Sequence, residues 1–344
     1  MAQNAFATYL AEVRPLIEEQ LASATREPKP AGRIEEDLRA YLHNPYDLFV
    51  EGGGKRTRPA LCLLGCEAAG GRREDALSMA SAIEHFQAAA LIHDDIADEG
   101  QLRRGKPCLY LVEGTGIAVN AGDLGIITAF TTVLHDERLS PEVRMRLLDE
   151  LVFMEERTIE GQALDLGWVR DGRWDITRED YLFMARHKTA YYSGATPLAA
   201  GAIVAGATEE QVSALRDFGM DTGLAFQLQD DLMNLVGDGE AQGKDFMSDI
   251  TEGKRTLVAV LALERLGQAE HDELVGILSS HTTDTVRLRR AVELFRESGA
   301  IDSVREYAQT LVAKAKQGLA DASLQKHALD VLLAMADYFV NRNS

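Results

Sequence analysis

The length, composition and charge of this chain limit the classes of protein to which it can belong. With 344 residues, 46% of them hydrophobic, it can bury a large core, and its length permits one large domain or two ordinary ones. The formal charge of -19, without a run rich in Lys and Arg, argues against a nucleic-acid-binding protein, because such proteins need a basic surface.

The cysteines and the N-terminal segment indicate a cytoplasmic protein. Cys62, Cys66 and Cys108 are too few and wrongly spaced for a zinc ribbon or a disulfide framework, which fits a reducing compartment. Charged residues such as Glu12 and Arg14 interrupt the N-terminal segment, so it does not resemble a targeting peptide. Since no later apolar run reaches the ~18 residues of a membrane span, we expect none.

Helical periodicity runs through almost the whole chain. Apolar residues recur at spacings of three and four, as in residues 9–21 and 147–154, while alternating strand patterns are scarce. Helix starts are indicated at Ser140-Pro141 and at Thr177, and helix ends at Gly70-Gly71, Gly206 and Gly237-Asp238-Gly239. No linker or fixed-period repeat divides the chain. We therefore predict an all-α fold, as a single domain over residues 1–344.

The first acidic cluster ends an apolar helix that runs from about Ile83 to Asp98. Asp94 and Asp98 lie one turn apart, so their carboxylates point the same way and repel each other. A divalent cation would compensate this repulsion, and Mg²⁺ typically takes one or two carboxylates together with waters and phosphate oxygens. The alternative is a solvated helix end, and this motif alone leaves both possibilities open.

A second apolar helical run ends in Asp230-Asp231, and basic residues follow both clusters, namely Arg103-Arg104 after the first and Lys244 and Lys254 after the second. Upstream, residues 52–59 (GGGKRTRP) combine glycines, which allow backbone amides to approach an anion, with basic side chains. On its own this stretch is equally well explained as a flexible loop with a solvated basic face.

Together these motifs resemble those of the trans-isoprenyl diphosphate synthases, the family of geranylgeranyl and farnesyl diphosphate synthases. The resemblance covers most of the chain, and the motifs occur in the family's order. They are residues 53–59 (GGKRTRP), 94–98 (DDIAD), 103–105 (RRG), 161–165 (GQALD), 188–189 (KT), 226–231 (FQLQDD), 243–244 (GK) and 252–256 (EGKRT). The resemblance implies a large helical bundle with a central cavity between the two Asp-rich helices.

The resemblance also implies a role for individual residues. Asp94, Asp98 and Asp230 would hold a trinuclear magnesium cluster on the allylic diphosphate, supported by Asp95 and Asp231. Thr189 and Gln227 would face the reacting carbons. The residues that match contacts to the allylic diphosphate are Arg103, Lys188, Lys244 and Lys254. Those that match the isopentenyl diphosphate pocket are Gly54, Lys55, Arg58, Gln87 and Arg104.

Two positions depart from the family's pattern. Gln87 stands where many relatives carry His, so it keeps a donor and an acceptor but cannot become charged. Asn234 stands where the second acidic motif usually has Asp, and an amide is a weaker ligand for a hard cation, so we assign it no metal contact. His93, beside Asp94, is expected to be a structural hydrogen-bonding residue rather than a catalytic one.

The implied reaction is a head-to-tail condensation. The allylic C–O bond of dimethylallyl, geranyl or farnesyl diphosphate breaks, the carbocation alkylates isopentenyl diphosphate, and a proton leaves. The enzyme is expected to be a homodimer. Ala89 and Ala90 lie about 6–8 Å from Asp94 along the helix, and Phe86 lies about 12 Å away. Small residues would pass a growing chain and Phe86 would stop it, which indicates geranylgeranyl diphosphate. Alternatively, Phe86 only packs in the core.

Three other interpretations stay open from the sequence. The product could be farnesyl diphosphate or a longer polyprenyl diphosphate. A terpene cyclase would share the first acidic motif, but it would have no use for an isopentenyl diphosphate pocket. A non-catalytic subunit of a heteromeric synthase would keep the fold, but such subunits lose their Asp clusters.

Overall fold

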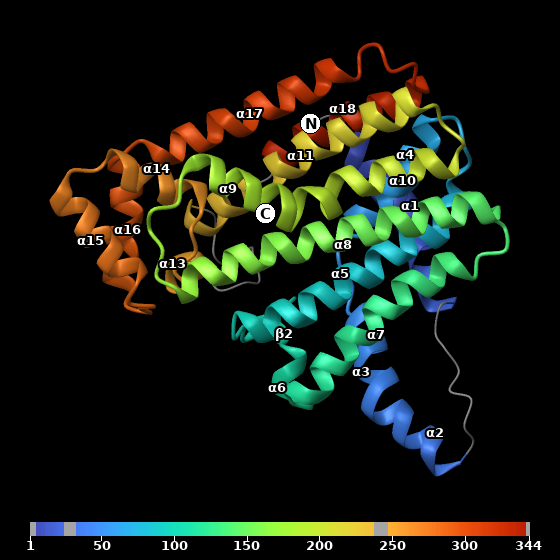
Figure 1. Cartoon of the computed structure of the whole chain (residues 1–344), viewed down its shortest axis with the longest axis horizontal. Coiled ribbons are helices and arrows are strands. Elements are labelled where there is room, and N and C mark those ends of the chain that lie inside the picture. Colours follow the sequence, from blue (N-terminus) through green and yellow to red (C-terminus); the bar gives the residue numbers. More distant parts are fainter. Residues whose placement is uncertain (1–4, 24–31, 237–246, 342–344) are drawn as a thin grey trace. The chain divides into compact units, whose positions relative to one another are not determined.

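The chain folds almost entirely into helices (Figure 1). A computed structural model describes residues 5–23, 32–236 and 247–341. Within these ranges the only strands are β1 (Leu102–Arg103) and β2 (Lys106–Pro107), which pair antiparallel with Leu102 opposite Pro107. The all-α class predicted from the periodicity is therefore confirmed.

Two compact units make up the chain. The first unit comprises Met1–Val152, Thr196–Leu215 and Ala322–Ala334, and the second comprises Phe153–Ala195, Arg216–Asp321 and Met335–Ser344. Three helices contribute residues to both units: α8 (Pro141–Arg170), α11 (Glu209–Val236) and α18 (Lys326–Asn341). A single domain over residues 1–344, with a central cavity, stays a prediction.

The other elements belong to one unit each. Those of the first unit are α1 (Ala5–Ser23), α2 (Arg33–Leu38), the π-helix η1 (Arg39–His43), α3 (Asn44–Glu51), α4 (Thr57–Ala68), the 3₁₀-helix η2 (Arg73–Ala76), α5 (Leu77–Ala97), β1 and β2, α6 (Leu109–Glu113), α7 (Thr115–Leu134) and α10 (Thr196–Val204). Those of the second are α9 (Arg178–Ala185), the π-helix η3 (Arg186–Ala195), α13 (Ser248–Thr251), α14 (Leu257–Arg265), α15 (Gln268–Leu278), α16 (Thr285–Glu297) and α17 (Ala300–Gly318).

Several predicted helix ends are confirmed by the backbone. The Thr177 hydroxyl accepts from the Asp180 amide, and the Asp180 carboxylate accepts from the Thr177 amide at 3.0 Å, a capping box at the start of α9. Gly70 and Gly206 follow α4 and α10 with φ of 89° and 71°, a conformation that favours glycine. The predicted stop at residues 237–239 lies outside the described residues.

Helix α5 is the buried centre of the first unit, where it packs against α4 and α7 (Figure 1). Two glycines bring α4 and α10 unusually close together. A Cβ on Gly65 would lie 2.3 Å from the Leu198 carbonyl oxygen, and a Cβ on Gly201 would lie 1.9 Å from the Cys62 carbonyl oxygen. Only a residue without a side chain fits at either position.

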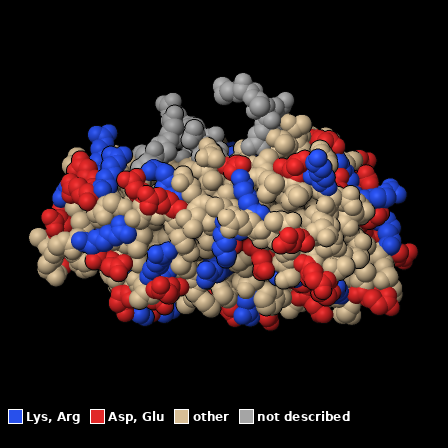
Figure 2. All heavy atoms as spheres, turned by 90° about the horizontal axis from the view of Figure 1, so that it is seen from above, with Lys and Arg blue, Asp and Glu red and all other residues tan. Residues whose placement is uncertain are grey.

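Charged side chains of both signs are spread over the face drawn in Figure 2. On the face drawn in Figure 2, Lys and Arg side chains lie between Asp and Glu side chains rather than together. The net charge of -19 is therefore carried by a mixed surface, so that any anionic substrate needs a local group of basic residues.

The close approach of α4 and α10 predicts a large cost for a small substitution. We expect Gly201→Ala to lower the free energy of unfolding by about 2–4 kcal/mol, because the added methyl collides with backbone that cannot move aside. The control is Gly276→Ala on α15, where a Cβ meets nothing within 4 Å and should be neutral or stabilise by up to ~1 kcal/mol. Urea denaturation measures both, and equal effects would contradict this account of the packing.

Candidate active site

The first acidic cluster lies at the C-terminal end of α5. Asp94 is in the last turn and Asp98 caps the helix, with its backbone N–H donating to the Asp94 carbonyl oxygen at 2.8 Å. Both side chains are half-buried, whereas Asp95 between them is buried. The predicted carboxylate pair therefore lies on one turn, partly withdrawn from water, in an arrangement suited to a hard cation.

Asp95 holds Arg103. The Arg103 Nε donates to Asp95 Oδ1 at 2.9 Å, and the positive φ angles of Arg104 and Gly105, 55° and 75°, form the turn of the β1–β2 hairpin that carries Arg103 there. Burial opposes the charge on Arg103, but its hydrogen bonds to Asp95 and the negative charge of Asp95 raise its pKa overall. Arg103 is therefore a fixed cation beside the acidic cluster.

The glycine-rich segment is anchored by Arg56, a residue that sequence reasoning left without a role. Arg56 is buried, and its guanidinium donates to Glu84 Oε1 at 2.5 Å, to Glu18 Oε1 at 3.0 Å and to the Val50 carbonyl oxygen at 2.6 Å. These bonds tie the start of α4 to α1, α3 and α5. The neighbouring Lys55 is exposed, as expected of a residue that meets substrate.

Gly54, Arg104 and Gln87, which are predicted to bind an anion, lie in the first unit. The Arg104 guanidinium lies over the Phe49 ring. A Cβ on Gly54 would come within 3.3 Å of this guanidinium, so the absence of a side chain at residue 54 leaves room for Arg104. Burial, together with the charges of Arg56 and Arg103, lowers the pKa of Arg104. Gln87 is buried, and its Oε1 has no hydrogen-bond partner among the described residues. A crowded group of cations favours an anionic ligand.

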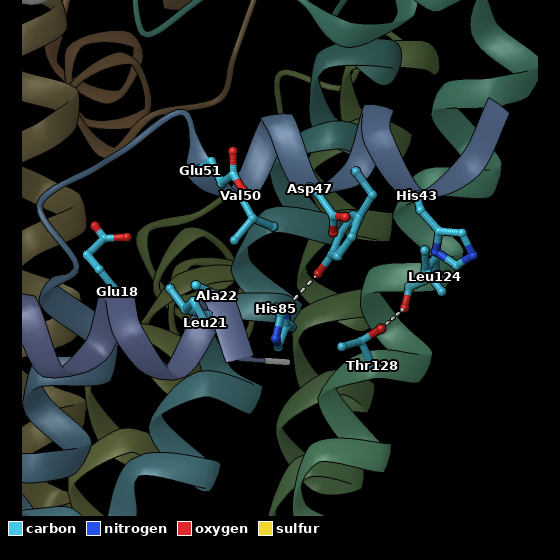
Figure 3. A pocket seen from close by; sticks show the side chains of 11 residues that line it. Glu18, Leu21, Ala22, His43, Asp47, Val50, Glu51, His85, Leu124 and Thr128 are labelled. Carbon is cyan, nitrogen blue, oxygen red and sulfur yellow. Dashed lines mark hydrogen bonds between the residues drawn. The ribbon is translucent and has the colours of Figure 1, made fainter. Parts of the chain in front are cut away.

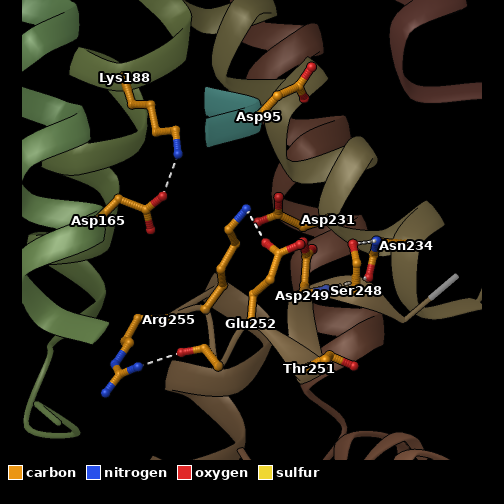
Figure 4. A network of polar contacts seen from close by, with 12 residues as sticks. Asp95, Asp165, Lys188, Asp231, Asn234, Ser248, Asp249, Thr251, Glu252 and Arg255 are labelled. Carbon is orange, nitrogen blue, oxygen red and sulfur yellow. Dashed lines mark hydrogen bonds and ion pairs between the residues drawn. The ribbon is translucent and has the colours of Figure 1, made fainter. Parts of the chain in front are cut away.

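In the second unit, Lys188 forms an ion pair with Asp165 (Figure 4). Lys188 lies on η3, and a Cβ on Gly161 of α8 would lie 2.1 Å from its backbone nitrogen, so the glycine lets these two helices meet. Burial alone would raise the pKa of Asp165, but the charges of Lys188 and Lys254 lower it overall. The motifs at residues 161–165 and 188–189 therefore form one feature.

A chain of hydrogen bonds connects the next predicted residues. The Thr189 hydroxyl donates to Gln227 Oε1, Gln227 Nε2 donates to Asp231 Oδ1, and the Tyr181 hydroxyl donates to Asp231 Oδ2, each at 2.7 Å. Burial of Asp231, and then the negative charge of Asp249, raise the pKa of Asp231. Asp231 thus positions Gln227, which in turn positions Thr189. Tyr181 was missed because nothing near it in the sequence marks it.

The Asn234 side chain is engaged with the protein itself (Figure 4). Its Nδ2 donates to Ser248 Oγ at 3.1 Å, and its Oδ1 accepts from the Asp249 amide at 3.2 Å. The amide thereby holds the start of α13 next to α11, a role that a carboxylate could fill only in part because it has no donor. This gives Asn234 a structural function and agrees with assigning it no metal contact.

The remaining predicted residues have varied surroundings. Lys254 pairs with Glu252 at 2.5 Å, Asp230 is half-buried on α11, and Lys244 lies outside the described residues. His93 lies against α7, where its Nε2 is 3.3 Å from the Val119 carbonyl oxygen and where a Cβ on Gly122 would collide with it. His93 therefore packs structurally, as expected.

The donor set fits magnesium better than a transition metal. Among the described residues there is no group of three or more His, Cys, Asp and Glu placed to hold a metal by themselves. Asp94, Asp98 and Asp230 offer oxygen ligands only, and burial, followed by the negative charge of Asp249, raises the pKa of the neighbouring Asp231 carboxyl. Magnesium typically needs only one or two protein carboxylates when substrate phosphates supply further oxygens.

Comparison with known proteins gives consistent matches. The family model described as polyprenyl synthetase matches residues 39–295. The chain is 38% identical to a short chain isoprenyl diphosphate synthase of Methanothermobacter thermautotrophicus, over 89% of this chain and 90% of that protein. It is 34% identical to a geranylfarnesyl diphosphate synthase of Natronomonas pharaonis, over 97% of each.

A solved structure is similar over nearly its whole length. The geranylgeranyl pyrophosphate synthase of Corynebacterium glutamicum, complexed with isoprenyl diphosphate and magnesium, matches with a TM-score of 0.87 and 30% identity. The match covers 98% of this chain and 99% of that one. The helical architecture of the chain is therefore shared with a protein of known structure.

Glu155 of α8 is a buried acid that the sequence did not single out. Its Oε1 has no hydrogen-bond partner among the described residues, and burial raises its pKa from 4.5 to about 8. Between these two values the unfolded chain ionises this group while the folded chain does not, so stability is lost as pH rises and the loss is complete above about pH 8.

We therefore expect Glu155→Gln to stabilise the protein in a pH-dependent way. The gain in free energy of unfolding should be on the order of 2–4 kcal/mol near pH ~8.5 and close to zero below pH ~4.5. Urea denaturation across this range measures it. The control is Glu156→Gln, at a neighbouring side chain that is 62% exposed. A gain independent of pH would contradict the assignment.

Proposed function

This chain belongs to the polyprenyl synthetase family, and from that membership we propose that it condenses isopentenyl diphosphate with an allylic diphosphate, head to tail and in trans, to give geranylgeranyl diphosphate. The family and the prenyltransferase class predicted from the motifs are confirmed. The observation that carries the proposal is that two of the predicted diphosphate-binding cations are held by buried carboxylates, Arg103 by Asp95 at the end of α5 and Lys188 by Asp165 of α8. A cyclase or a non-catalytic subunit gains no support.

The first unit supplies residues for the diphosphate of isopentenyl diphosphate. We assign this role to Lys55, Arg58, Arg104 and Gln87, with Gly54 providing the space that Arg104 needs. The crowding that lowers the pKa of Arg104 would be relieved when an anion binds, because negative charge compensates the neighbouring Arg56 and Arg103. The Arg56 network keeps this segment in place before substrate arrives.

Asp94, Asp98 and Asp230 would hold magnesium, and we propose three ions when the allylic diphosphate is bound. The magnesium in the Corynebacterium glutamicum structure supports this choice of metal. When bound, magnesium neutralises the charge that develops on a departing diphosphate. Arg103, Lys188, Lys244 and Lys254 would bind the same diphosphate, and Asp95 and Asp165 would hold two of these cations in position.

Thr189 and Gln227 would face the reacting carbons. Their hydrogen bonds run through Asp231 to Tyr181, so both are held in fixed orientations, with Thr189 buried and Gln227 half-buried. A dry and pre-organised site matters for this reaction, because a carbocation that meets water gives an alcohol instead of a longer chain. The side chains assigned here supply no nucleophile, which suits a reaction in which the double bond of isopentenyl diphosphate attacks.

The small residues below the acidic cluster support a product longer than farnesyl diphosphate. Ala89 is buried, Ala90 is half-buried, and Phe86 lies one turn deeper than Ala90 on α5. Similar proteins bear the names geranylgeranyl and geranylfarnesyl diphosphate synthase, which fits a channel of intermediate to long reach. Dimethylallyl, geranyl and farnesyl diphosphates are all proposed as primers.

The apolar outer face of α7 is proposed to be covered by a second copy of the chain, in a cytoplasmic homodimer. By length and composition alone this helix could cross a membrane, although the sequence predicts no such span, and 39% of its most apolar stretch is buried. Val119, Ile127 and Leu134 are 40%, 54% and 46% exposed and recur every seven or eight residues on one side. A stripe of exposed apolar side chains of this kind favours packing against a helix of a partner chain.

Removal of a metal-binding carboxylate should abolish turnover without unfolding the protein. We expect Asp94→Ala and Asp230→Ala each to lower kcat by at least ~100-fold in a magnesium-dependent assay with radiolabelled isopentenyl diphosphate. Asp330→Ala, at an exposed carboxylate on α18, is the control and should keep wild-type turnover. Wild-type activity in either of the first two variants, with an unchanged thermal transition, would refute the metal assignment.

The homodimer predicts a mass of twice the chain's 37.7 kDa in solution. Sedimentation velocity at micromolar concentration should show this species, and Ile127→Glu should shift it toward the monomer because a charge on the covered face costs several kcal/mol. Val286→Glu, at a residue of α16 that is 73% exposed, should leave the mass unchanged. A wild-type monomer would contradict the proposal.

A further inference from the structure

Arg255 directly follows Lys254 and is a buried cation to which the proposed mechanism gives no role. The residue is 3% exposed. Burial lowers the pKa of Arg255 to about 10, and the negative charge of Asp165 offsets this effect only in part. A cation in such surroundings costs free energy of folding, which favours a role for Arg255 in the site over a purely structural one.

The Arg255 guanidinium is held by three groups of the second unit. Its Nε donates to the Arg173 carbonyl oxygen at 2.7 Å, and another of its nitrogens donates to the Gly253 carbonyl oxygen (Figure 4). Its central carbon lies over the Trp174 ring, 3.8 Å from the ring centre. Arg173 comes 82 positions before Arg255 in the sequence. Arg255 therefore joins the loop between α8 and α9 to the segment that precedes α14.

The C-terminal end of α15 fixes both the ring and the turn that Arg255 contacts. The Trp174 Nε1 donates to the Oγ of Ser279, the residue that caps this helix, at 2.9 Å. A Cβ on Gly253 would lie 2.8 Å from the Leu278 carbonyl oxygen, and the φ of Gly253, 65°, favours glycine. The contacts thus close into a ring that starts and ends at α15. We call this ring, made by residues 173–174, 253, 255 and 278–279, the Arg255 clamp.

Lys254 lies between Gly253 and Arg255, so the clamp fixes the backbone on both sides of it. The positive charge of Lys254 lowers the pKa of Asp165, the carboxylate that pairs with Lys188. The Lys254 ammonium group is therefore near the same carboxylate as Lys188. The clamp holds the backbone from which Lys254 reaches this cluster of charges.

We propose that Arg255 is a positioning residue for the prenyl transfer: through the clamp, it fixes Lys254 in the direction in which its ammonium group binds the allylic diphosphate. This inference rests on the proposed function. A displacement of about 1 Å of a binding group can lower a rate by on the order of 100-fold, so a fixed backbone at Lys254 favours catalysis. We assign Arg255 no contact with the substrate, so its effect passes through Lys254.

Removal of the guanidinium should impair the use of the allylic substrate selectively. We expect Arg255→Met to lower kcat/KM for farnesyl diphosphate about 10-fold, while KM for isopentenyl diphosphate stays within about 2-fold of the wild-type value. The two substrates should differ because the residues assigned to isopentenyl diphosphate lie in the first unit and the clamp lies in the second. Trp174→Leu should show the same selectivity, and Trp174→Phe, which keeps a ring over the guanidinium, should retain most of the wild-type activity. Arg170→Met, at a side chain that is 78% exposed, is the matched control and should change neither value.

A double-mutant cycle separates positioning of Lys254 from a structural role. If Arg255 acts through Lys254, Arg255→Met made in a Lys254→Met background should change kcat/KM for farnesyl diphosphate by less than about 2-fold. Losses that multiply in the double variant, or equal losses with both substrates, would overturn the inference. If circular dichroism shows that Arg255→Met does not fold, Trp174→Leu carries the same cycle. A wild type that makes no product with any primer would refute the proposed function, and this inference with it.

Discussion

The chain places a dense group of carboxylates where a helix tolerates them least. Asp94, Asp95 and Asp98 lie at the C-terminal end of α5, where unsatisfied carbonyl groups already give the helix a partial negative charge. Like charges one turn apart add to that cost. Arg103 offsets the charge of Asp95, and we propose that magnesium, bound with a diphosphate, compensates the charges of Asp94 and Asp98. Much of the surrounding structure serves this electrostatic requirement.

The basic residues that we assign to substrate binding are held in place by other residues before substrate binds. The buried Arg56 fixes the start of α4, Gly54 leaves room for Arg104, and Asp165 holds Lys188. In each case a residue to which we assign no substrate contact positions one that we propose to bind substrate. Pre-organised charge of this kind is effective in catalysis because no reorganisation is needed when the leaving group departs.

The sequence predicted the features that depend on local spacing. The all-α class, the cap at Thr177 and the carboxylate pair of Asp94 and Asp98 follow from helical periodicity and short motifs, and all three are present. Contacts between distant segments could not be predicted, because no spacing encodes them. One hydrogen bond connects Tyr181 to Asp231, which lies 50 positions further along the chain, and another connects Tyr46 to His85, 39 positions further along (Figure 3). The burial of Glu155 likewise depends on residues that pack around it in the fold.

Sizing the products of the purified wild-type chain shows whether it joins isopentenyl diphosphate to an allylic primer. Radiolabelled isopentenyl diphosphate would be supplied with dimethylallyl, geranyl or farnesyl diphosphate, with magnesium or with a chelator. We expect labelled geranylgeranyl diphosphate as the main product with magnesium and none with the chelator. The absence of any elongated product with every primer would contradict it.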